Sequence, residues 1–124
     1  MTDARKAFGV QGERVAEALL RERGYRILER NVRTKLGELD LVARDGDTLC
    51  FIEVKARRSA AFGMPQEAVT RQKQLHLTRA AQCYLKAKGL TGAPARFDVV
   101  ALILGPDGRP TYSDIIRHAF EVAT

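Results

Sequence analysis

Cysteine, histidine and tryptophan are scarce in this chain, and their scarcity argues against several kinds of site. The 124 residues include two cysteines, two histidines and no tryptophan. Cys50 and Cys83 have no Cys-x-x-Cys partner and no histidine beside them, which argues against a zinc site. We expect both to be buried free thiols, as in a reducing cytoplasm. His76 and His118 are isolated, and no serine or cysteine has a spacing that singles it out as a nucleophile.

Long apolar runs and aromatic residues are also few. No apolar run approaches the ~20 residues of a membrane-spanning helix. Residues 1–6 are mostly polar and contain no apolar signal core. We therefore expect a cytoplasmic protein without a membrane segment. With five phenylalanines and three tyrosines, a base-stacking platform is not evident in the sequence.

The composition that remains is that of a globular, basic protein. Hydrophobic residues make up 45% of the chain and charged residues 29%, and the net charge is +6. The length predicts one domain over 1–124 with its own core. An excess of lysine and arginine is typical of proteins that bind nucleic acid. Many small soluble proteins are equally basic for no specific reason, so charge alone leaves both interpretations open.

Hydrophobic periodicity and turn residues predict an α/β fold. The expected elements are a helix over 9–23, a strand over 25–33, strands over 38–43 and 48–55, a helix over 65–88, a strand over 97–104, a short strand over 111–113 and a brief helix over 115–121. Gly24 and Gly89 end the two longer helices, and Pro65 opens the second of them. This order suits a mixed sheet with helices on both faces.

Charged residues concentrate on the hairpin formed by the second and third strands. They are Glu38, Asp40, Glu53 and Lys55. If the loop spans two residues (45–46) or four (44–47), side-chain alternation sets all of them on one face. Glu38 would then lie directly opposite Glu53, with Asp40 diagonal to it. A three-residue loop would send Glu53 to the other face from Asp40.

Opposed carboxylates destabilise a strand pair, and a hard cation removes that conflict. Mg²⁺ is typically held by one or two carboxylates together with water and substrate phosphates. Asp40 and Glu53 suit such a site, and Lys55 could stabilise negative charge that develops on a phosphate. The reaction class that this pattern indicates is phosphodiester hydrolysis. The alternative is an exposed face of ion pairs, which contributes only about 0–1 kcal/mol per pair and needs no metal.

The spacing of Asp40 and Glu53-Val54-Lys55 resembles the D…(D/E)-x-K motif of restriction-endonuclease-like nucleases. In those proteins an acidic residue on a preceding helix usually completes the site. Glu13 fits this position by its distance from Gly24, as in archaeal Holliday junction resolvases, and Glu17 competes with it one turn later. The chain is more similar to the small bacterial YraN-like (UPF0102) family, from about residue 8 to 120. The stretches that carry this resemblance are 37–46, 51–55, 73–74 and 96–101.

The resemblance implies a restriction-endonuclease-like, three-layer α/β/α fold with a central mixed sheet. It also implies an endonuclease that uses Mg²⁺ or Mn²⁺ and hydrolyses DNA, with branched or damaged DNA as an option. Catalytic residues would be Glu13, Asp40, Glu53 and Lys55, and the metal ligands Asp40, Glu53, Glu13 and Glu38. A homodimer is expected by analogy with junction-cleaving relatives. A non-catalytic nucleic-acid-binding module that keeps the nuclease fold is the alternative.

The remaining candidates are expected to contact substrate or support the site. Arg57 and Arg58 follow the motif and could clamp phosphates, although a solvated basic strand end is the simpler explanation. Lys73 and Gln74, in the first half of the second helix, would support the site by resemblance, or else form an ordinary polar face. Glu38 is also a possible ion-pair partner for Lys55 or an arginine. Asp98 is read as structural.

Overall fold

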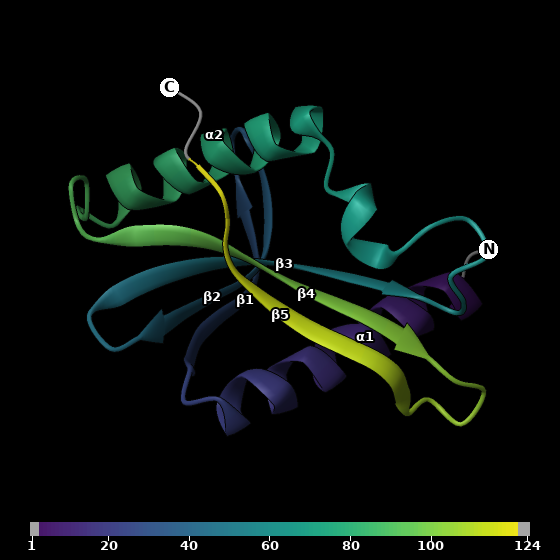
Figure 1. The fold of residues 1–124 in the computed structure, drawn as a ribbon. Coiled ribbons are helices and arrows are strands. Elements are labelled where there is room, and N and C mark those ends of the chain that lie inside the picture. Colours follow the sequence, from purple (N-terminus) through teal and green to yellow (C-terminus); the bar gives the residue numbers. More distant parts are fainter. Residues whose placement is uncertain (1–2, 122–124) are drawn as a thin grey trace.

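A five-stranded mixed sheet lies between two helices in the computed structural model, which describes residues 3–121 (Figure 1). The elements are α1 (Asp3–Glu22), β1 (Arg26–Thr34), β2 (Gly37–Asp45), β3 (Thr48–Arg57), the short 3-10 helix η1 (Pro65–Ala68), α2 (Arg71–Ala87), β4 (Ala95–Leu104) and β5 (Pro110–Phe120). The strand order is β1-β2-β3-β4-β5. Only β3 and β4 are parallel, and η1 and α2 form the crossover between them. The expected three-layer α/β/α architecture is confirmed.

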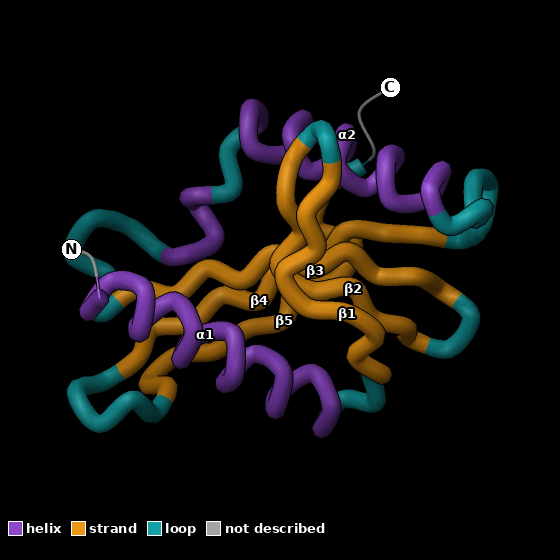
Figure 2. Tube along the Cα trace, turned by 180° about the vertical axis from the view of Figure 1, so that it is seen from behind, coloured by secondary structure: helices purple, strands orange, loops and turns teal. Residues whose placement is uncertain are grey.

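Each face of the sheet has its own apolar core. Ala16 and Leu20 of α1 pack on one face, in a cluster that contains Leu41, Ile52 and Val100. Figure 2 shows α1 and α2 on opposite sides of the strands. On the α2 side, the buried side chains are Leu77, Ala80, Ala81 and Tyr84 of the helix with Leu39, Val42, Leu49, Phe51 and Phe97 of the sheet. The central strands β2, β3 and β4 are therefore largely buried, whereas many side chains of β1 and β5 remain exposed.

α1 begins at Asp3, six residues before its expected start, and two later elements differ more strongly from the prediction. The segment 115–121, expected to be a helix, continues β5 as far as Phe120. The isoleucine pair Ile115-Ile116 bonds to β4, and pairing along this otherwise open edge outweighs a weak helical pattern. The helix expected over 65–88 is divided instead. Its first turn is η1, and α2 starts after Thr70, whose side chain accepts a hydrogen bond from the Lys73 amide.

The hairpin register also differs from the expected one. Leu41 pairs with Ile52 and Asp45 with Thr48, so the connecting loop is Gly46-Asp47. Gly46 has a φ of 61°, which a tight hairpin turn requires and glycine adopts without strain. The pairing is displaced by two residues from the prediction, so Glu38 does not lie opposite Glu53.

The cysteines and the helices bear on two further expectations. Cys50 is buried, and burial, with Asp98 nearby, raises the pKa of its thiol to about 12. Cys83 is only half-buried, because it lies on α2 beside a groove along β1; the expectation of a buried thiol is wrong there. Within residues 3–121, no helix is both long and apolar enough to cross a membrane. Residues 1–2 and 122–124 of the predicted single domain lie outside the described part.

Candidate active site

The candidate site lies where β2 and β3 separate. Their backbone pairing ends at Leu41 and Ile52, while β3 stays paired with β4 as far as Arg57. Beyond this point the β1–β2 hairpin turns toward α2 (Figure 2), and Gly37 packs against Ala80 of that helix. The Val54 amide, which has lost its partner on β2, donates instead to Oδ2 of Asp40 at 2.9 Å. The Asp40 carboxylate thus takes the place of a missing ladder acceptor.

The separation opens a cavity of about 270 Å³, which we call the fork cavity. It is lined by Phe8, Gly9, Glu13, Asp40, Glu53, Val54, Lys55, Ala56 and Lys73. Glu13 comes from α1 and Lys73 from α2, although the two helices cover opposite faces of the sheet. They reach one cavity because β2 no longer closes the sheet there.

Glu53 is the most deeply buried charged group of the cavity, with 4% of its surface exposed. The Nζ atoms of Lys55 and Lys73 each lie 3.4 Å from its Oε2 atom. Burial raises the pKa of the Glu53 carboxyl to about 7, and the negative charge of Asp40 adds to the effect. The two lysines act in the opposite direction but do not cancel it.

Glu13 is the carboxylate that α1 contributes to the cavity. Its pKa is raised, first by burial and then by the charge of Asp40. Glu17 lies elsewhere and forms two hydrogen bonds with the Arg30 guanidinium, of 2.7 and 2.9 Å. Of the two candidates on this helix, Glu13 is therefore the one that faces Asp40 and Glu53.

Asn31 is a residue that the sequence did not single out. The β1–β2 register sets it opposite Asp40, and its side chain acts on Glu13, whose pKa it lowers against the larger effect of burial. It has a φ of 50°, a left-handed conformation that asparagine tolerates better than most residues. An asparagine inside a predicted strand was the available signal, since asparagine is depleted from strands. It bridges β1 and α1 next to the carboxylates.

The remaining predicted residues divide between the cavity and other positions. Glu38 is exposed, does not line the fork cavity and pairs with Arg33 across the strands, so its expected place among the carboxylates is wrong. The Gln74 amide donates to the Val69 carbonyl and supports the start of α2 instead of the cavity. The Arg58 guanidinium lies 4.3 Å from the ring centroid of Phe8, at the cavity wall. Arg57, one residue earlier, is half-buried at the end of β3.

The side chains of the cavity that could bind a metal are carboxylates, and their oxygen atoms suit a hard cation such as Mg²⁺. The negative charge of Asp40 helps to raise the pKa of Glu53, a conflict between the two carboxylates that a divalent cation would relieve. Within residues 3–121, no three acidic, histidine or cysteine side chains converge as a ready metal cluster. The fit is therefore to a two-carboxylate site that takes its other ligands from water and a substrate phosphate.

The larger groove of the molecule has different chemistry. It measures about 1010 Å³ and runs between β1 and α2, and its lining includes Val32, Cys83, Tyr84, Ala87, Arg33 and three lysines. Glu29 is its single carboxylate, and it already accepts a hydrogen bond from Tyr84 and pairs with Lys88. The groove is larger than the fork cavity but lacks paired carboxylates, so its size does not make it the stronger candidate.

Comparison with known proteins identifies the family. The chain matches the model described as Uncharacterised protein family UPF0102 over residues 12–102. It belongs to the UPF0102 family. A UPF0102 protein of Desulfosudis oleivorans is 47% identical over 98% of this chain and 95% of its own length. Those of Syntrophus aciditrophicus and Moorella thermoacetica are 50% and 49% identical, over 93% and 97% of this chain and 89% and 100% of their own lengths.

The segment that matches the UPF0102 model contains every charged residue of the fork cavity. Glu13 lies near its start and Lys73 well inside it, whereas β5 lies beyond its end. The names of the family and of these relatives state no reaction. The chemistry therefore rests on the geometry of the cavity.

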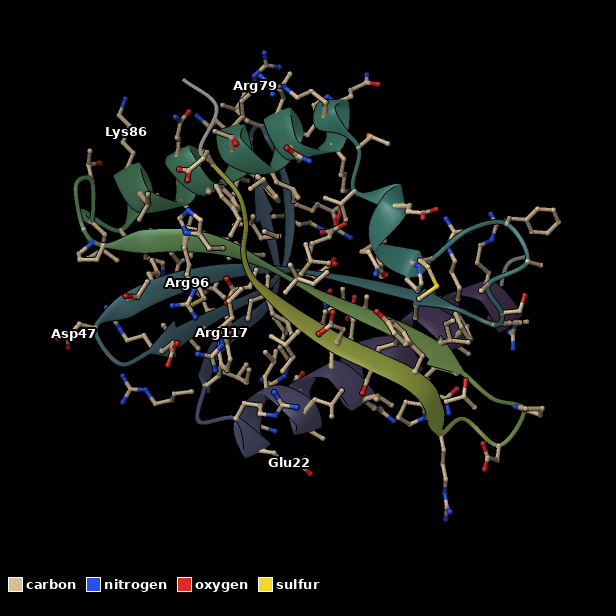
Figure 3. All side chains as sticks on the ribbon, in the orientation of Figure 1. Glu22, Asp47, Arg79, Lys86, Arg96 and Arg117 are labelled. Carbon is tan, nitrogen blue, oxygen red and sulfur yellow. The ribbon has the colours of Figure 1, made fainter. Side chains whose placement is uncertain are left out.

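A buried ionic network near the start of β4 supports the sheet. Asp98 is fully buried and accepts hydrogen bonds from Tyr25, Arg96 and the His118 amide, at 2.7, 2.9 and 2.9 Å. Arg96 and Arg117, labelled in Figure 3, also reach Asp45 at the turn of the hairpin. Burial and the bond to Asp98 raise the pKa of Tyr25 to about 12, so its hydroxyl remains a donor. The structural interpretation of Asp98 is confirmed.

Gly12 determines how closely α1 approaches the cavity. A Cβ atom at this buried position would lie 2.9 Å from the Cβ of Ala56 on β3. Gly12→Ala is expected to lower the free energy of unfolding by about 1–2 kcal/mol, because overpacking outweighs the gain in helix propensity. Urea unfolding measures this difference.

Gly9→Ala is the matched control for the Gly12 substitution. Gly9 lies in the same helix, and a Cβ there meets no atom within 4 Å. The free energy of unfolding of the Gly9→Ala protein is expected to rise by up to about 1 kcal/mol. In the Gly12→Ala background, Ala56→Gly should recover part of the loss. A Gly12→Ala protein as stable as Gly9→Ala would contradict the close helix–strand contact.

Proposed function

We propose that this protein is a cytoplasmic, metal-dependent endonuclease that hydrolyses phosphodiester bonds of DNA. The observation that carries the proposal is the fork cavity. Three carboxylates and two ammonium groups, from four elements, line one space of about 270 Å³. The raised pKa of Glu53 supports a functional role, because strongly perturbed carboxyls cluster at catalytic sites.

The lysines are the groups that would act on the phosphate. Lys55 and Lys73 both lie on the cavity wall and share the Glu53 carboxylate. A phosphate that enters the cavity meets two ammonium groups already in position, so little reorganisation is needed to stabilise negative charge. Lys55 is the nearer in sequence to Arg57, the last residue of β3, and to Arg58, which follows it.

Glu13 is the group that would hold or accept a proton of the attacking water. It faces Asp40 from α1, and its raised pKa makes its carboxylate a better base than an exposed glutamate. The side chain of Asn31, which acts on Glu13 from β1, would help to orient it. Arg57 and Arg58, at the end of β3, would hold the neighbouring phosphates of the strand.

Asp40 and Glu53 would hold the metal ion, with Glu13 close by. When bound, Mg²⁺ or Mn²⁺ supplies charge neutralisation at the phosphate and lowers the pKa of a water molecule. A bound cation would also favour the charged form of Glu53, whose carboxyl keeps its proton up to about pH 7 without metal. Lys73, which is partly exposed, is free to leave Glu53 for a phosphate.

A panel of structured DNA and RNA substrates with Mg²⁺ or Mn²⁺ tests the activity. Wild type should cut at least one DNA substrate, and Lys55→Ala should cut it about 100-fold more slowly or worse. Lys86→Ala is the matched control, since Lys86 lies on α2 outside the cavity (Figure 3) and should leave the rate unchanged. A wild type inactive on every substrate, or a Lys55→Ala protein as active as wild type, would contradict the proposal.

Metal binding can be tested without any substrate. Mg²⁺ or Mn²⁺ is expected to raise the melting temperature of wild type above that in monovalent salt of equal ionic strength. A ligand at 100-fold excess over its Kd contributes about 2.7 kcal/mol. Asp40→Asn should melt at or above the wild-type temperature without metal, because it removes a repelling charge and can still accept the Val54 hydrogen bond.

The Asp40→Asn protein should also lose most of the response to metal. An ion-paired face predicts the reverse: the variant would be less stable, and divalent metal would add nothing. Differential scanning fluorimetry of both proteins across a metal titration separates the two cases.

A further inference from the structure

Phe62 is the most exposed large hydrophobic side chain of the described residues, with 92% of its surface accessible. The next is Leu36, at 57%. A phenylalanine in this position makes almost no packing contribution to the fold. Because burial of an apolar ring is favourable, a partner that covers the ring would bind more tightly. The ring is therefore available to a partner, and its surroundings decide which kind of partner fits.

The loop that carries Phe62 is held by its own hydrogen bonds. The Gly63 amide donates to the Ala60 carbonyl at 3.1 Å, and the Ala61 amide to the Ser59 hydroxyl at 3.3 Å. The Met64 amide bonds to Glu67 at the start of η1. These contacts fix the backbone on both sides of Phe62. A ring presented on an ordered loop loses less conformational entropy on binding than one on a flexible segment.

This loop begins at the wall of the fork cavity. Arg58 lies over the ring of Phe8, which lines the cavity. Phe62 lies four positions after Arg58, so their Cα atoms are at most ~14 Å apart even in a fully extended chain. This upper limit on the distance equals the length of about four nucleotides at the 3.4 Å spacing of a duplex strand. Figure 1 shows the loop, in teal, projecting beyond the end of β3 beside the start of α1.

The charges around the ring favour a nucleic acid over a protein partner. Arg57 and Arg58 precede the loop, and the first carboxylate after them is Glu67, whose side chain is engaged with the Met64 amide. Proteins that bind single-stranded nucleic acid commonly place cationic side chains along its phosphate backbone and an aromatic ring where a base can stack. Inside a duplex each base is covered by its neighbours, so such a ring meets an open base face only at a terminal pair.

We propose that Phe62 stacks on an unpaired base a few nucleotides from the scissile phosphate. The site would then act on nucleic acid that has a single-stranded segment, such as a splayed arm or a flap, in preference to continuous duplex. This inference rests on the proposed nuclease function for the position of the scissile phosphate. The stacking itself requires only binding.

Tryptophan fluorescence gives a direct test, because the natural chain contains no tryptophan. Phe62→Trp introduces one reporter at the loop, and Leu36→Trp introduces a control at the exposed tip of the β1–β2 hairpin. Each variant is titrated in EDTA with a blunt duplex and with the same duplex carrying a splayed arm. We expect the emission of Phe62→Trp to be quenched by the splayed substrate only, and that of Leu36→Trp to stay unchanged.

Affinity for the same two substrates provides the second measurement. Phe62→Ala should weaken binding of the splayed substrate about tenfold and leave duplex binding within about twofold, whereas Phe62→Tyr should retain wild-type affinity. Phe62→Leu keeps an apolar side chain without a flat ring and should behave like Phe62→Ala. A leucine variant that binds normally would indicate a general hydrophobic contact and overturn the stacking proposal.

Three other results would also overturn the proposal. They are no quenching of Phe62→Trp, equal quenching by both substrates, and equal quenching of the Leu36→Trp control. Cleavage assays keep the two proposals separate. Selective quenching by a protein that never cleaves would contradict the nuclease alone, whereas cleavage with unaltered binding by Phe62→Ala would contradict the stacking alone.

Discussion

Glu53→Gln is expected to stabilise the folded protein at neutral pH and to abolish its cleavage of DNA. Glu53 is buried beside Asp40, and its pKa is raised to about 7. The folded state therefore disfavours the charged carboxylate, and a neutral amide of similar shape avoids that penalty. A raised pKa from 4.5 to about 7 corresponds to about 3 kcal/mol at most. Cleavage should fall at least ~100-fold, because the amide cannot replace the lost negative charge.

The sign of the pH dependence follows from the direction of the shift. Below about pH 4.5 the carboxyl is protonated in both the folded and the unfolded chain, and the substitution should have little effect. Between about pH 4.5 and 7 the unfolded chain releases the proton while the folded protein keeps it, so wild type loses stability. The advantage of Glu53→Gln should therefore grow across this window and level off above pH 7.

Urea unfolding of wild type and variant at several pH values measures this difference. Glu17→Gln is the matched control, since it makes the same change at a carboxylate that accepts two hydrogen bonds from Arg30. It should lower stability by about 1 kcal/mol at neutral pH. If Glu53→Gln were also destabilising at pH 8, the two lysines would dominate at Glu53, and the site would be an ion-pair cluster.

Asp98→Ala is expected to have the largest effect on folding. Asp98 is fully buried and bonds to Tyr25, Arg96 and the His118 amide, so its removal leaves three donors without their acceptor. Breaking a buried ion pair from one side typically destabilises by 3–5 kcal/mol. Because small domains are stable by only about 5–15 kcal/mol, much of the protein should unfold at mild urea concentrations.

Asp45→Ala separates burial from charge in this experiment. Asp45 binds the same Arg96 guanidinium, at 2.7 Å, but is more exposed than Asp98. The hydrogen bond from Arg96 holds the pKa of Asp45 below its usual range, yet solvent screens such a pair, and the loss should not exceed about 1 kcal/mol. Equal losses for the two variants would show that the network is not organised around Asp98.

The hairpin shows which features of the site the sequence could predict. The Asp-Gly pair predicted the turn, and side-chain alternation predicted that Asp40 and Glu53 share one face of the hairpin. The actual loop, residues 46–47, differs from both predicted loops. The pairing of β2 with β3 is shifted by two residues, and an even shift keeps each side chain on its predicted face of the sheet. The opposition of Glu38 and Glu53 depended on the pairing itself and is wrong. A hairpin turn is a local property, whereas the point at which two strands separate depends on what each packs against.

Long-range contacts explain the other differences. β5 forms because β4 offers an unpaired edge, and nothing within residues 115–121 reveals that edge. Lys73 reaches Glu53 only through the docking of α2, so its spacing to the motif is uninformative. Phe62 has the opposite difficulty. Its type predicts burial, and only the fold shows that it is exposed.

The single parallel pair of strands has a consequence for the order of folding. β1, β2 and β3 are joined by short turns, so Asp40, Glu53 and Lys55 belong to a meander with contacts that are local in sequence. The β3–β4 pair joins Leu49 to Ala95 across η1 and α2, and closing that loop is entropically slower. We expect the meander to form first in refolding and α2 to dock with β4. The carboxylates would then be assembled before Lys73 arrives to neutralise them, and a divalent cation present during refolding would stabilise that intermediate stage.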